Sequence, residues 1–290
     1  MNEPAKPDWI KIRLSPGRTF SHISNLLREL NLASVCEEAH CPNFSECWSA
    51  STVTFMALGR KCTRACRFCA VERDFPGEAL DLEYPKRLAE AVVRLELNYA
   101  VLTSVCRDDL EDGGAEHLAR CITLIKSARP STHVEALIPD FQGKRASLRS
   151  VLDSSPDVLS HNIETVRSLQ AKVRDPRASY DQSLSVLEKA KILKPRVITK
   201  SSMMLGFGES EDEVISTMKD LRNVSVDILT IGQYLRPSKR HIEVHNYIHP
   251  NRFDYLRELG ERMGFACVSA GPLVRSSYRI DEILPRMMSR

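Results

Sequence analysis

The sequence predicts an α/β protein whose body is a partial (βα)6 barrel of the TIM type, with N- and C-terminal extensions covering the open end. Short apolar or β-branched runs alternate with helix-patterned segments over roughly residues 50–235. Such alternation is typical of parallel strands joined by crossover helices. This region holds six strand–helix units, which are too few for a closed barrel of eight.

Local patterns predict each element in turn. Strands are expected over 52–58, 99–104, 133–138, 157–162, 196–205 and 226–232, and helices between them over 85–97, 115–128, 181–193 and 210–222. Residues 21–31 predict an earlier amphipathic helix capped by Ser21. The tail predicts a helix, a strand and a loop. We therefore expect an N-terminal extension over 1–50, the barrel over 51–235 and a C-terminal extension over 236–290.

Composition narrows the class of protein. The 290 residues carry a formal net charge of only +3, which does not indicate a nucleic-acid partner. No run of about 18 apolar residues suits a transmembrane helix, and the first residues do not resemble a signal peptide. The nine cysteines are an odd number in a chain of ordinary size, so a disulfide framework is not expected. These features predict a cytoplasmic protein without a membrane partner.

Six of the nine cysteines fall into two groups of three. The first group is spaced x4 and x5, the second x3 and x2; they are Cys36, Cys41 and Cys47, then Cys62, Cys66 and Cys69. Thiolates select zinc, Cu(I) or iron–sulfur clusters. Structural zinc usually takes four protein ligands, often in two pairs, and two triplets do not divide in that way. Three thiolates around a 4Fe–4S cluster leave one iron free for a substrate or cofactor.

The triplet of Cys62, Cys66 and Cys69 follows the first expected strand, where the loops of βα folds carry their chemistry. Its tight spacing allows one loop to bind three corners of one cluster. Phe68, just before the last cysteine, has a flat face suited to stacking on a base. A zinc site and a purely structural cluster are the alternatives left open by the residues themselves.

The cysteine motifs resemble those of a known family. Cys-x3-Cys-x2-Cys with an aromatic residue before the third cysteine resembles the radical S-adenosylmethionine (SAM) signature. The triplet in "SVCEEAHCPNFSECW" resembles the auxiliary-cluster motif of the lipoyl synthase family. So do the blocks "TSVCRDDLEDGGAEHLA", "LIPDFQG", "HNIET", "TKSSMMLGFGE", "LTIGQYLRPS" and "GPLVRSSYR". The resemblance runs from about residue 8 to 279.

The resemblance implies two 4Fe–4S clusters and SAM as cofactors. Cys62, Cys66 and Cys69 would bind the cluster whose open iron chelates SAM. The other triplet would bind an auxiliary cluster that supplies sulfur. In this family a serine of the Arg-Ser-Ser-Tyr segment is its fourth ligand, and here Ser277 is preferred to Ser276. A hard oxygen ligand exchanges more readily than a thiolate, which suits a cluster that is dismantled for its sulfur.

The resemblance also implies SAM contacts at the ends of several strands. The expected residues are Phe68, Thr103, Ser104, Asn162, Glu164, Lys200 and Arg236. Thr103 and Ser104 have strand-end capping as their alternative, and Lys200 has an ordinary ion pair. Glu209 is expected either near SAM or as a first-turn helix carboxylate.

The implied reaction inserts two sulfur atoms at carbons 6 and 8 of a protein-bound octanoyl-lysine chain. The implied partners are an octanoylated lipoyl carrier domain or H-protein, a reduced flavodoxin- or ferredoxin-type electron donor and an iron–sulfur cluster carrier. Lys239 and Arg240 are candidates for docking an acidic carrier domain, or belong to a solvated loop. The alternatives are another sulfur-inserting radical SAM enzyme, of the methylthiotransferase kind, and a non-catalytic iron–sulfur or zinc protein.

The chain departs from the family pattern at a few positions. Cys106 stands where the family usually has aspartate, Ser202 replaces a common glycine, and the ending after Tyr278 differs. The first change removes a carboxylate near the expected SAM pocket. Cys121 and Cys267 are expected to be buried structural thiols.

Overall fold

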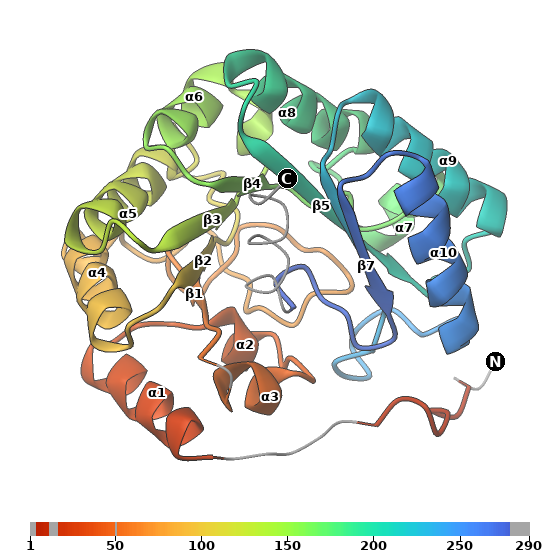
Figure 1. Cartoon of the computed structure of the whole chain (residues 1–290), viewed down its shortest axis with the longest axis horizontal. Helices are drawn as coiled ribbons and strands as arrows, with labels where there is room; N and C mark the ends of the chain where they lie inside the picture. The colour runs from red at the N-terminus through yellow and green to blue at the C-terminus, as the bar shows by residue number, and fades with distance from the viewer. Residues whose placement is uncertain (1–3, 12–16, 50, 279–290) are drawn as a thin grey trace.

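The computed structural model describes residues 4–11, 17–49 and 51–278. A parallel sheet of seven strands forms its centre, with the strands in chain order from β1 to β7. They are β1 (Thr54–Met56), β2 (Tyr99–Thr103), β3 (His133–Leu137), β4 (Val158–Ser160), β5 (Ile198–Leu205), β6 (Ile228–Gln233) and β7 (Cys267–Gly271). Figure 1 shows the strands in an open arc with the helices outside it, as expected for a partial barrel.

All six expected strands form, and the predicted strand of the tail adds a seventh. β7 pairs in parallel with β6 from Ile228↔Cys267 to Gly232↔Gly271. The parallel sheet therefore extends beyond residue 235, where the sequence suggested that the barrel ends. The reason is that the helix of the tail is itself a crossover, which returns the chain to the sheet edge in the parallel sense.

Helices cover the outer face of the sheet. The crossover helices are α4 (Tyr84–Arg94), α5 (Ala115–Ala128), α6 (Arg145–Asp153), α8 (Tyr180–Leu193), α9 (Glu211–Asn223) and α10 (Pro250–Arg262). Shorter elements are α2 (Val35–Glu38), α3 (Phe44–Ser49), η1 (Phe141–Gly143), η2 (Arg167–Leu169) and α7 (Gln170–Val173). In the described part of the chain, no helix has the length and apolar character needed to span a membrane.

The first helix starts earlier than expected. α1 spans Arg18–Glu29, and its N-cap is Gly17, without a side-chain cap. Ser21 is therefore not the cap but a first-turn residue, whose N–H donates to the Gly17 carbonyl at 3.3 Å. The prediction of a Ser21 cap is wrong because the helical backbone continues one turn upstream of the apolar pattern.

The N-terminal helices share the core of the barrel. Trp48 of α3 and Leu26 of α1 belong to the same cluster of buried side chains as Phe55 of β1 and Leu88 of α4. The cluster is continuous, so its apolar burial stabilises the extension and the barrel together. This packing holds the segment of Cys36, Cys41 and Cys47 against the first strand.

Candidate active site

The loop 62–69 leaves the carboxyl end of β1 and folds back on itself. The N–H of Cys62 donates to the Glu72 carbonyl at 2.8 Å, and the Asp74 N–H donates to the Cys62 carbonyl at 3.1 Å. The Cys69 N–H donates to the Cys66 carbonyl at 3.2 Å. These backbone bonds close a compact turn that brings the three thiols to one end of the barrel.

Two of the thiols accept hydrogen bonds from the backbone. The Arg64 N–H lies 3.4 Å from the Cys62 sulfur, and the Asp175 N–H lies 3.4 Å from the Cys66 sulfur. Such N–H···S bonds stabilise anionic sulfur and tune iron–sulfur clusters. Burial alone raises the pKa of the Cys66 thiol, and that of Cys69 to about 12. A bound metal reverses that preference because it binds the thiolate. The donor set therefore fits a cluster.

Cys106, the departure from the family pattern, contacts this loop directly. Its carbonyl accepts from the Thr63 N–H at 3.0 Å and from the Thr63 hydroxyl at 2.9 Å. A hydrogen bond between the two thiols holds the pKa of Cys62 below its ordinary range and that of Cys106 above it. Cys106 therefore places a thiol beside Cys62, one of the expected cluster ligands, at a position where an aspartate would place a negative charge.

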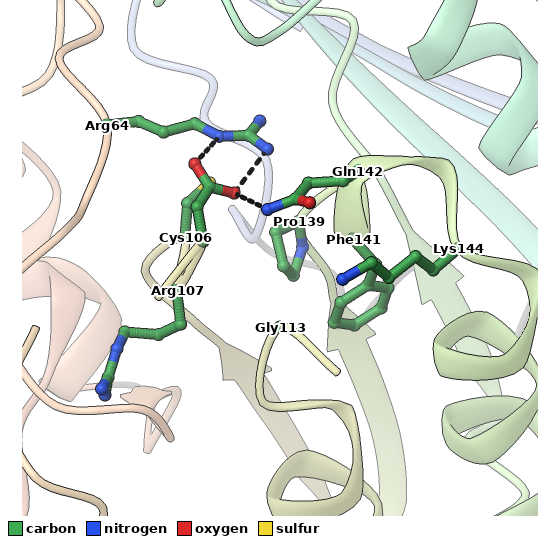
Figure 2. A pocket seen from close by; sticks show the side chains of 9 residues that line it. Arg64, Cys106, Arg107, Gly113, Pro139, Phe141, Gln142 and Lys144 are labelled. Atoms are coloured by element: carbon green, nitrogen blue, oxygen red, sulfur yellow. Dashed lines mark hydrogen bonds and ion pairs between the residues drawn. The ribbon is translucent and has the colours of Figure 1, made fainter. Parts of the chain in front are cut away.

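An ion-pair network that the sequence analysis missed fixes the loop from behind. Arg64 binds both oxygens of Asp108 at 2.8 Å and both oxygens of Asp140 at 2.7 Å. The Arg64 side chain is 3% exposed and that of Asp140 is fully buried. Figure 2 shows Arg64 facing the carboxylate that also accepts from Gln142. Because both carboxylates follow strand ends, this network fastens the loop to the β2 and β3 edges.

A small pocket lies next to this network. Its lining is Arg64, Cys106, Arg107, Asp108, Gly113, Pro139, Phe141, Gln142 and Lys144 (Figure 2). None of the three cysteines of the 62–69 triplet lines it. The pocket therefore belongs to the support of the loop rather than to the expected SAM site.

A second support comes from the segment after α7. The Asp175 carboxylate accepts from the Ala65 N–H at 2.7 Å, and Arg177 donates to the Thr63 carbonyl at 2.7 Å. The Arg67 N–H donates to the Val173 carbonyl at 2.9 Å. The loop is thus held from both sides before any cluster binds, which lowers the entropy lost on binding.

Several buried polar atoms just after β2, β4 and α7 have no hydrogen-bond partner in the described residues. The Asn162 amide donates to Glu164 at 3.2 Å, while its oxygen has no hydrogen-bond partner in the described residues. The same is true of the Ser104 hydroxyl and of Nε of Arg174, a cation only 7% exposed. Burial raises the pKa of Glu164. Buried groups without partners usually await a ligand or water, so these residues fit a polar cofactor such as SAM.

The other expected SAM contacts lie around the same rim. Thr103 ends β2, and its carbonyl accepts from the Ala57 N–H at 2.9 Å. Phe68 packs against an apolar cluster of Val173, Phe207, Tyr234, Ile242 and Val244. These apolar neighbours hold the Phe68 ring in place, and its stacking on the adenine base of SAM stays a prediction.

Arg236 organises the loop after β6. It donates to the His241 carbonyl at 2.9 Å and to the Lys239 carbonyl at 2.7 Å. His241 in turn lies 3.0 Å from the Cys69 carbonyl through Nε2. The described contacts of Arg236 therefore connect this loop to the cysteine triplet.

Glu209 is not a first-turn carboxylate of α9, as one of the two expectations had it, because the helix begins two residues later at Glu211. The Glu209 carboxylate accepts from the N–H groups of Gly206 and Phe207 at 2.5 and 2.9 Å. It precedes α9, whose own N-cap is Ser210, with a capping box to Glu213. Gly206 has φ +107°, and a Cβ there would lie 2.2 Å from the Gln233 amide nitrogen. The carboxylate and the glycine together shape the turn after β5.

Lys200 forms the ion pair that was the alternative to a SAM contact. Its ammonium lies 3.0 Å from both oxygens of Glu135, which also accepts from Tyr99 and Ser160. Lys200 pairs in register with Ser160, the last residue of β4, and with Ile228, the first residue of β6. Burial lowers its pKa, although Glu135 opposes that effect. The ion pair gives Lys200 a structural role, and a contact with SAM stays a prediction.

Replacing Lys200 by methionine is therefore expected to destabilise the fold without weakening SAM binding. The change leaves Glu135 buried without its cation, which typically costs about 3–5 kcal/mol. Changing Glu135 to glutamine as well should recover part of that loss. Urea unfolding and SAM titration of the folded fraction measure the two effects. A raised SAM dissociation constant with unchanged stability would contradict this assignment.

The cysteines Cys36, Cys41 and Cys47 lie at the same end of the molecule. They are called the second triplet from here on because they would bind the second, auxiliary cluster, and Cys62, Cys66 and Cys69 are called the first triplet. Ala33, two residues before Val35 at the start of α2, accepts the N–H of Met56 in β1 at 2.9 Å. Val35, the neighbour of Cys36, belongs to one apolar cluster with Cys62 and Cys69. The segments that carry the two triplets therefore pack against each other, as two clusters acting on one substrate require.

The tail also meets the second triplet. The Asn43 amide donates to the Leu273 carbonyl at 2.6 Å, and the Tyr278 hydroxyl donates to Glu46 at 2.9 Å. Arg275 is near enough to lower the pKa of Cys41, which burial otherwise raises. The turn that contains Ser276 and Ser277 thus lies between residues that contact the triplet, although these segments are more than 200 positions apart.

In the described residues, no three His, Cys, Asp or Glu side chains are arranged to hold a single metal ion.

Comparisons with known proteins identify the family. The chain matches the Radical SAM superfamily over residues 56–221 and the N-terminal domain of lipoyl synthase of the Radical SAM family over residues 2–41. It is 51% identical to a lipoyl synthase of Halorhodospira halophila over 96% of this chain and 84% of that one. It is 52% identical to a lipoyl synthase of Thermus thermophilus over 96% and 86%, respectively.

Solved structures agree on the fold. Methylornithine synthase (PylB) superposes with a TM-score of 0.55 at 13% identity, covering 81% of this chain and 80% of that chain. The hydrogenase maturase HydG of Carboxydothermus hydrogenoformans superposes with a TM-score of 0.54 at 14% identity, covering 93% and 78%. At these identities the similarity concerns the fold alone. On the sequence matches and the cysteine geometry together, the chain belongs to the lipoyl synthase family of radical SAM enzymes.

Proposed function

We propose that the chain inserts two sulfur atoms at carbons 6 and 8 of an octanoyl-lysine chain on a lipoyl carrier protein. The observation that carries this proposal is the packing of two cysteine triplets at one end of the barrel, with the serine turn beside the second. When bound, SAM and the first cluster supply a 5′-deoxyadenosyl radical, and the second cluster supplies sulfide. Unactivated C–H bonds are beyond side-chain acid–base chemistry, so a radical is required.

The protein's own residues bind the two clusters and SAM and orient them toward each other. Cys62, Cys66 and Cys69 bind the first cluster on a loop held by the Arg64 network. Thr103, Ser104, Asn162 and Glu164 contact SAM, and Phe68 and Arg236 complete the rim; Arg174 is an added candidate. Cys36, Cys41, Cys47 and Ser277 bind the second cluster. The extensions over 1–50 and 236–290 together form this second site beside the barrel over 51–235.

The chemistry of the reaction indicates which partner proteins are needed. Each radical consumes one electron, so we propose a reduced flavodoxin- or ferredoxin-type donor. The second cluster loses sulfur, so we propose an iron–sulfur cluster carrier that restores it. A lipoyl carrier domain or H-protein presents the octanoyl chain, and the exposed Lys239 and Arg240 are the surface cations proposed to meet its acidic residues. We propose that the reaction takes place in the cytoplasm.

The direct test is anaerobic turnover. Reconstituted protein with dithionite, SAM and an octanoylated carrier peptide is expected to release 5′-deoxyadenosine and to form lipoyl peptide. SAM cleavage without peptide thiolation would favour another sulfur-inserting radical SAM enzyme. Bound zinc without SAM cleavage would favour a non-catalytic metal protein.

Replacing Ser277 by alanine is expected to retain SAM cleavage and to reduce lipoyl formation. The change removes one oxygen ligand of the second cluster and leaves the first triplet untouched. Product analysis by mass spectrometry measures both outcomes, with Ser276→Ala as the matched control. Undiminished lipoyl formation by Ser277→Ala would reject Ser277 as the ligand.

A further inference from the structure

The two serines of the tail are the central residues of a tight turn. The Tyr278 N–H donates to the Arg275 carbonyl at 3.1 Å and closes the turn around Ser276 and Ser277. In the part of the chain that the structure describes, the hydrogen bonds of this segment are made by the residues that flank the serines, so the position of the serines depends on how the flanks are held. The conformation of the flanks therefore determines whether a serine oxygen reaches the second triplet.

Two side chains from α3 and the residue before it hold the flanks. Asn43 donates to the Leu273 carbonyl at 2.6 Å, on the upstream side of the serines. Glu46 accepts from the Tyr278 hydroxyl at 2.9 Å, on the downstream side. Both holders lie in the sequence between Cys41 and Cys47. The serine turn is thus held on both sides by Asn43 and Glu46, which come from the segment between the proposed cluster ligands Cys41 and Cys47.

A close backbone approach fixes the same segment from the barrel side. Val274 crosses β6 at Gly232, where a Cβ atom would lie 2.1 Å from the Val274 carbonyl oxygen. The Val274 N–H donates to the Gly271 carbonyl at 3.1 Å as the chain leaves β7. The tail can therefore follow this path only because residue 232 is a glycine.

The two contacts differ in burial. Asn43 is 2% exposed, whereas Glu46 and Tyr278 are half-buried. Hydrogen bonds shielded from water are stronger than exposed ones, and a bond to a carboxylate is stronger than one to a neutral group. The Tyr278–Glu46 bond is consequently well placed to hold the turn.

We propose that Tyr278 and Glu46, assisted by Asn43, form a clasp that positions the serine turn at the second cluster. They act as positioning residues, since they fasten the backbone on either side of the serines. The inference rests on the proposed function and adds to it the residues that keep the serine in place. An oxygen ligand binds iron of these clusters less firmly than a thiolate. With the clasp closed, a serine that leaves iron stays close enough to return.

The test measures iron release, which does not require turnover. Anaerobically reconstituted wild-type protein should hold two clusters, about eight irons per chain. Tyr278→Phe and Glu46→Ala are each expected to release half of that iron to a chelator about tenfold faster or more, since each loses a hydrogen bond to a charged group. Glu46→Gln should release iron at the wild-type rate because its amide oxygen still accepts from Tyr278.

Two controls separate a positioning role from a general loss of stability. Tyr255→Phe removes a hydroxyl from an exposed tyrosine on α10 and should leave iron release unchanged. Tyr278→Phe should keep wild-type rates of SAM cleavage, because the first triplet is not altered. Circular dichroism checks that each variant is folded. If Tyr278→Phe does not fold, Glu46→Ala tests the same hydrogen bond.

Three results would overturn one idea or the other. Iron release at the wild-type rate from both Tyr278→Phe and Glu46→Ala would reject the clasp. Equal acceleration of all the iron would also reject it, since the effect would then not be local to one cluster. Wild-type protein that holds iron for a single cluster would overturn the proposed function instead.

Discussion

Replacing Cys41 by alanine is expected to leave SAM cleavage intact and to lower lipoyl formation by more than about a hundredfold, because supporting residues of metal sites already contribute ten- to hundredfold. The Cys41 thiol belongs to the second triplet, on the segment before α3, and packs against the apolar cluster that contains Trp48. Cys66→Ala should instead abolish both activities, because it removes a ligand of the SAM-binding cluster. The two variants thereby divide the reaction into radical formation and sulfur delivery.

The measurement pairs product analysis with iron content. Each cysteine variant should hold about half of the wild-type iron, as expected for the loss of one of two 4Fe–4S clusters. Cys121→Ala is the matched control, because Cys121 is a fully buried thiol in α5, within the apolar core. It should retain both clusters and both activities. Lipoyl formation by Cys41→Ala at the wild-type rate would contradict the role of the second triplet.

Replacing Arg64 by leucine is expected to lower the free energy of unfolding of the cluster-free protein by about 3–5 kcal/mol, the usual effect of breaking a buried ion pair. The change leaves the buried Asp140 without its cation, whereas Asp108 keeps Arg177, whose Nη1 lies 3.1 Å from Oδ2 of Asp108. Both carboxylates have pKa values below the ordinary range, and that of Asp140 is held at about 2 against the raising effect of burial. Without Arg64, Asp140 would have to bind a proton or the site would have to open to water.

Arg64→Lys should be nearly as damaging. A lysine is a single point charge and cannot bind two carboxylates at two atoms each. Urea unfolding of the cluster-free protein measures stability, and iron content after reconstitution measures the first site. Arg94→Leu is the control, since Arg94 forms an exposed pair with Glu29 and should leave stability nearly unchanged. Full iron loading of folded Arg64→Leu would show that the network is not needed to shape the loop.

Local patterns were enough to predict most of the framework. The six expected strands form where apolar runs predicted them, because β-branched and apolar runs between helical segments have few other buried arrangements. The Cys62-x3-Cys66-x2-Cys69 spacing is likewise local, since one turn of backbone must reach three corners of one cluster. The start of α1 could not be predicted from the local pattern around Ser21, because helix boundaries depend on backbone contacts that periodicity does not encode.

By itself, the sequence determined the parallel α/β fold and membership of the family, and it predicted the cysteine ligands, because short-range spacing and strand–helix alternation limit these features directly. Only the tertiary structure decided which distant groups meet. Lys200 meets Glu135, Arg64 meets Asp140, and Tyr278 meets Glu46. In each pair the two residues lie on different elements that are far apart in the sequence. Which of them meet follows from strand order and packing, which no local pattern contains.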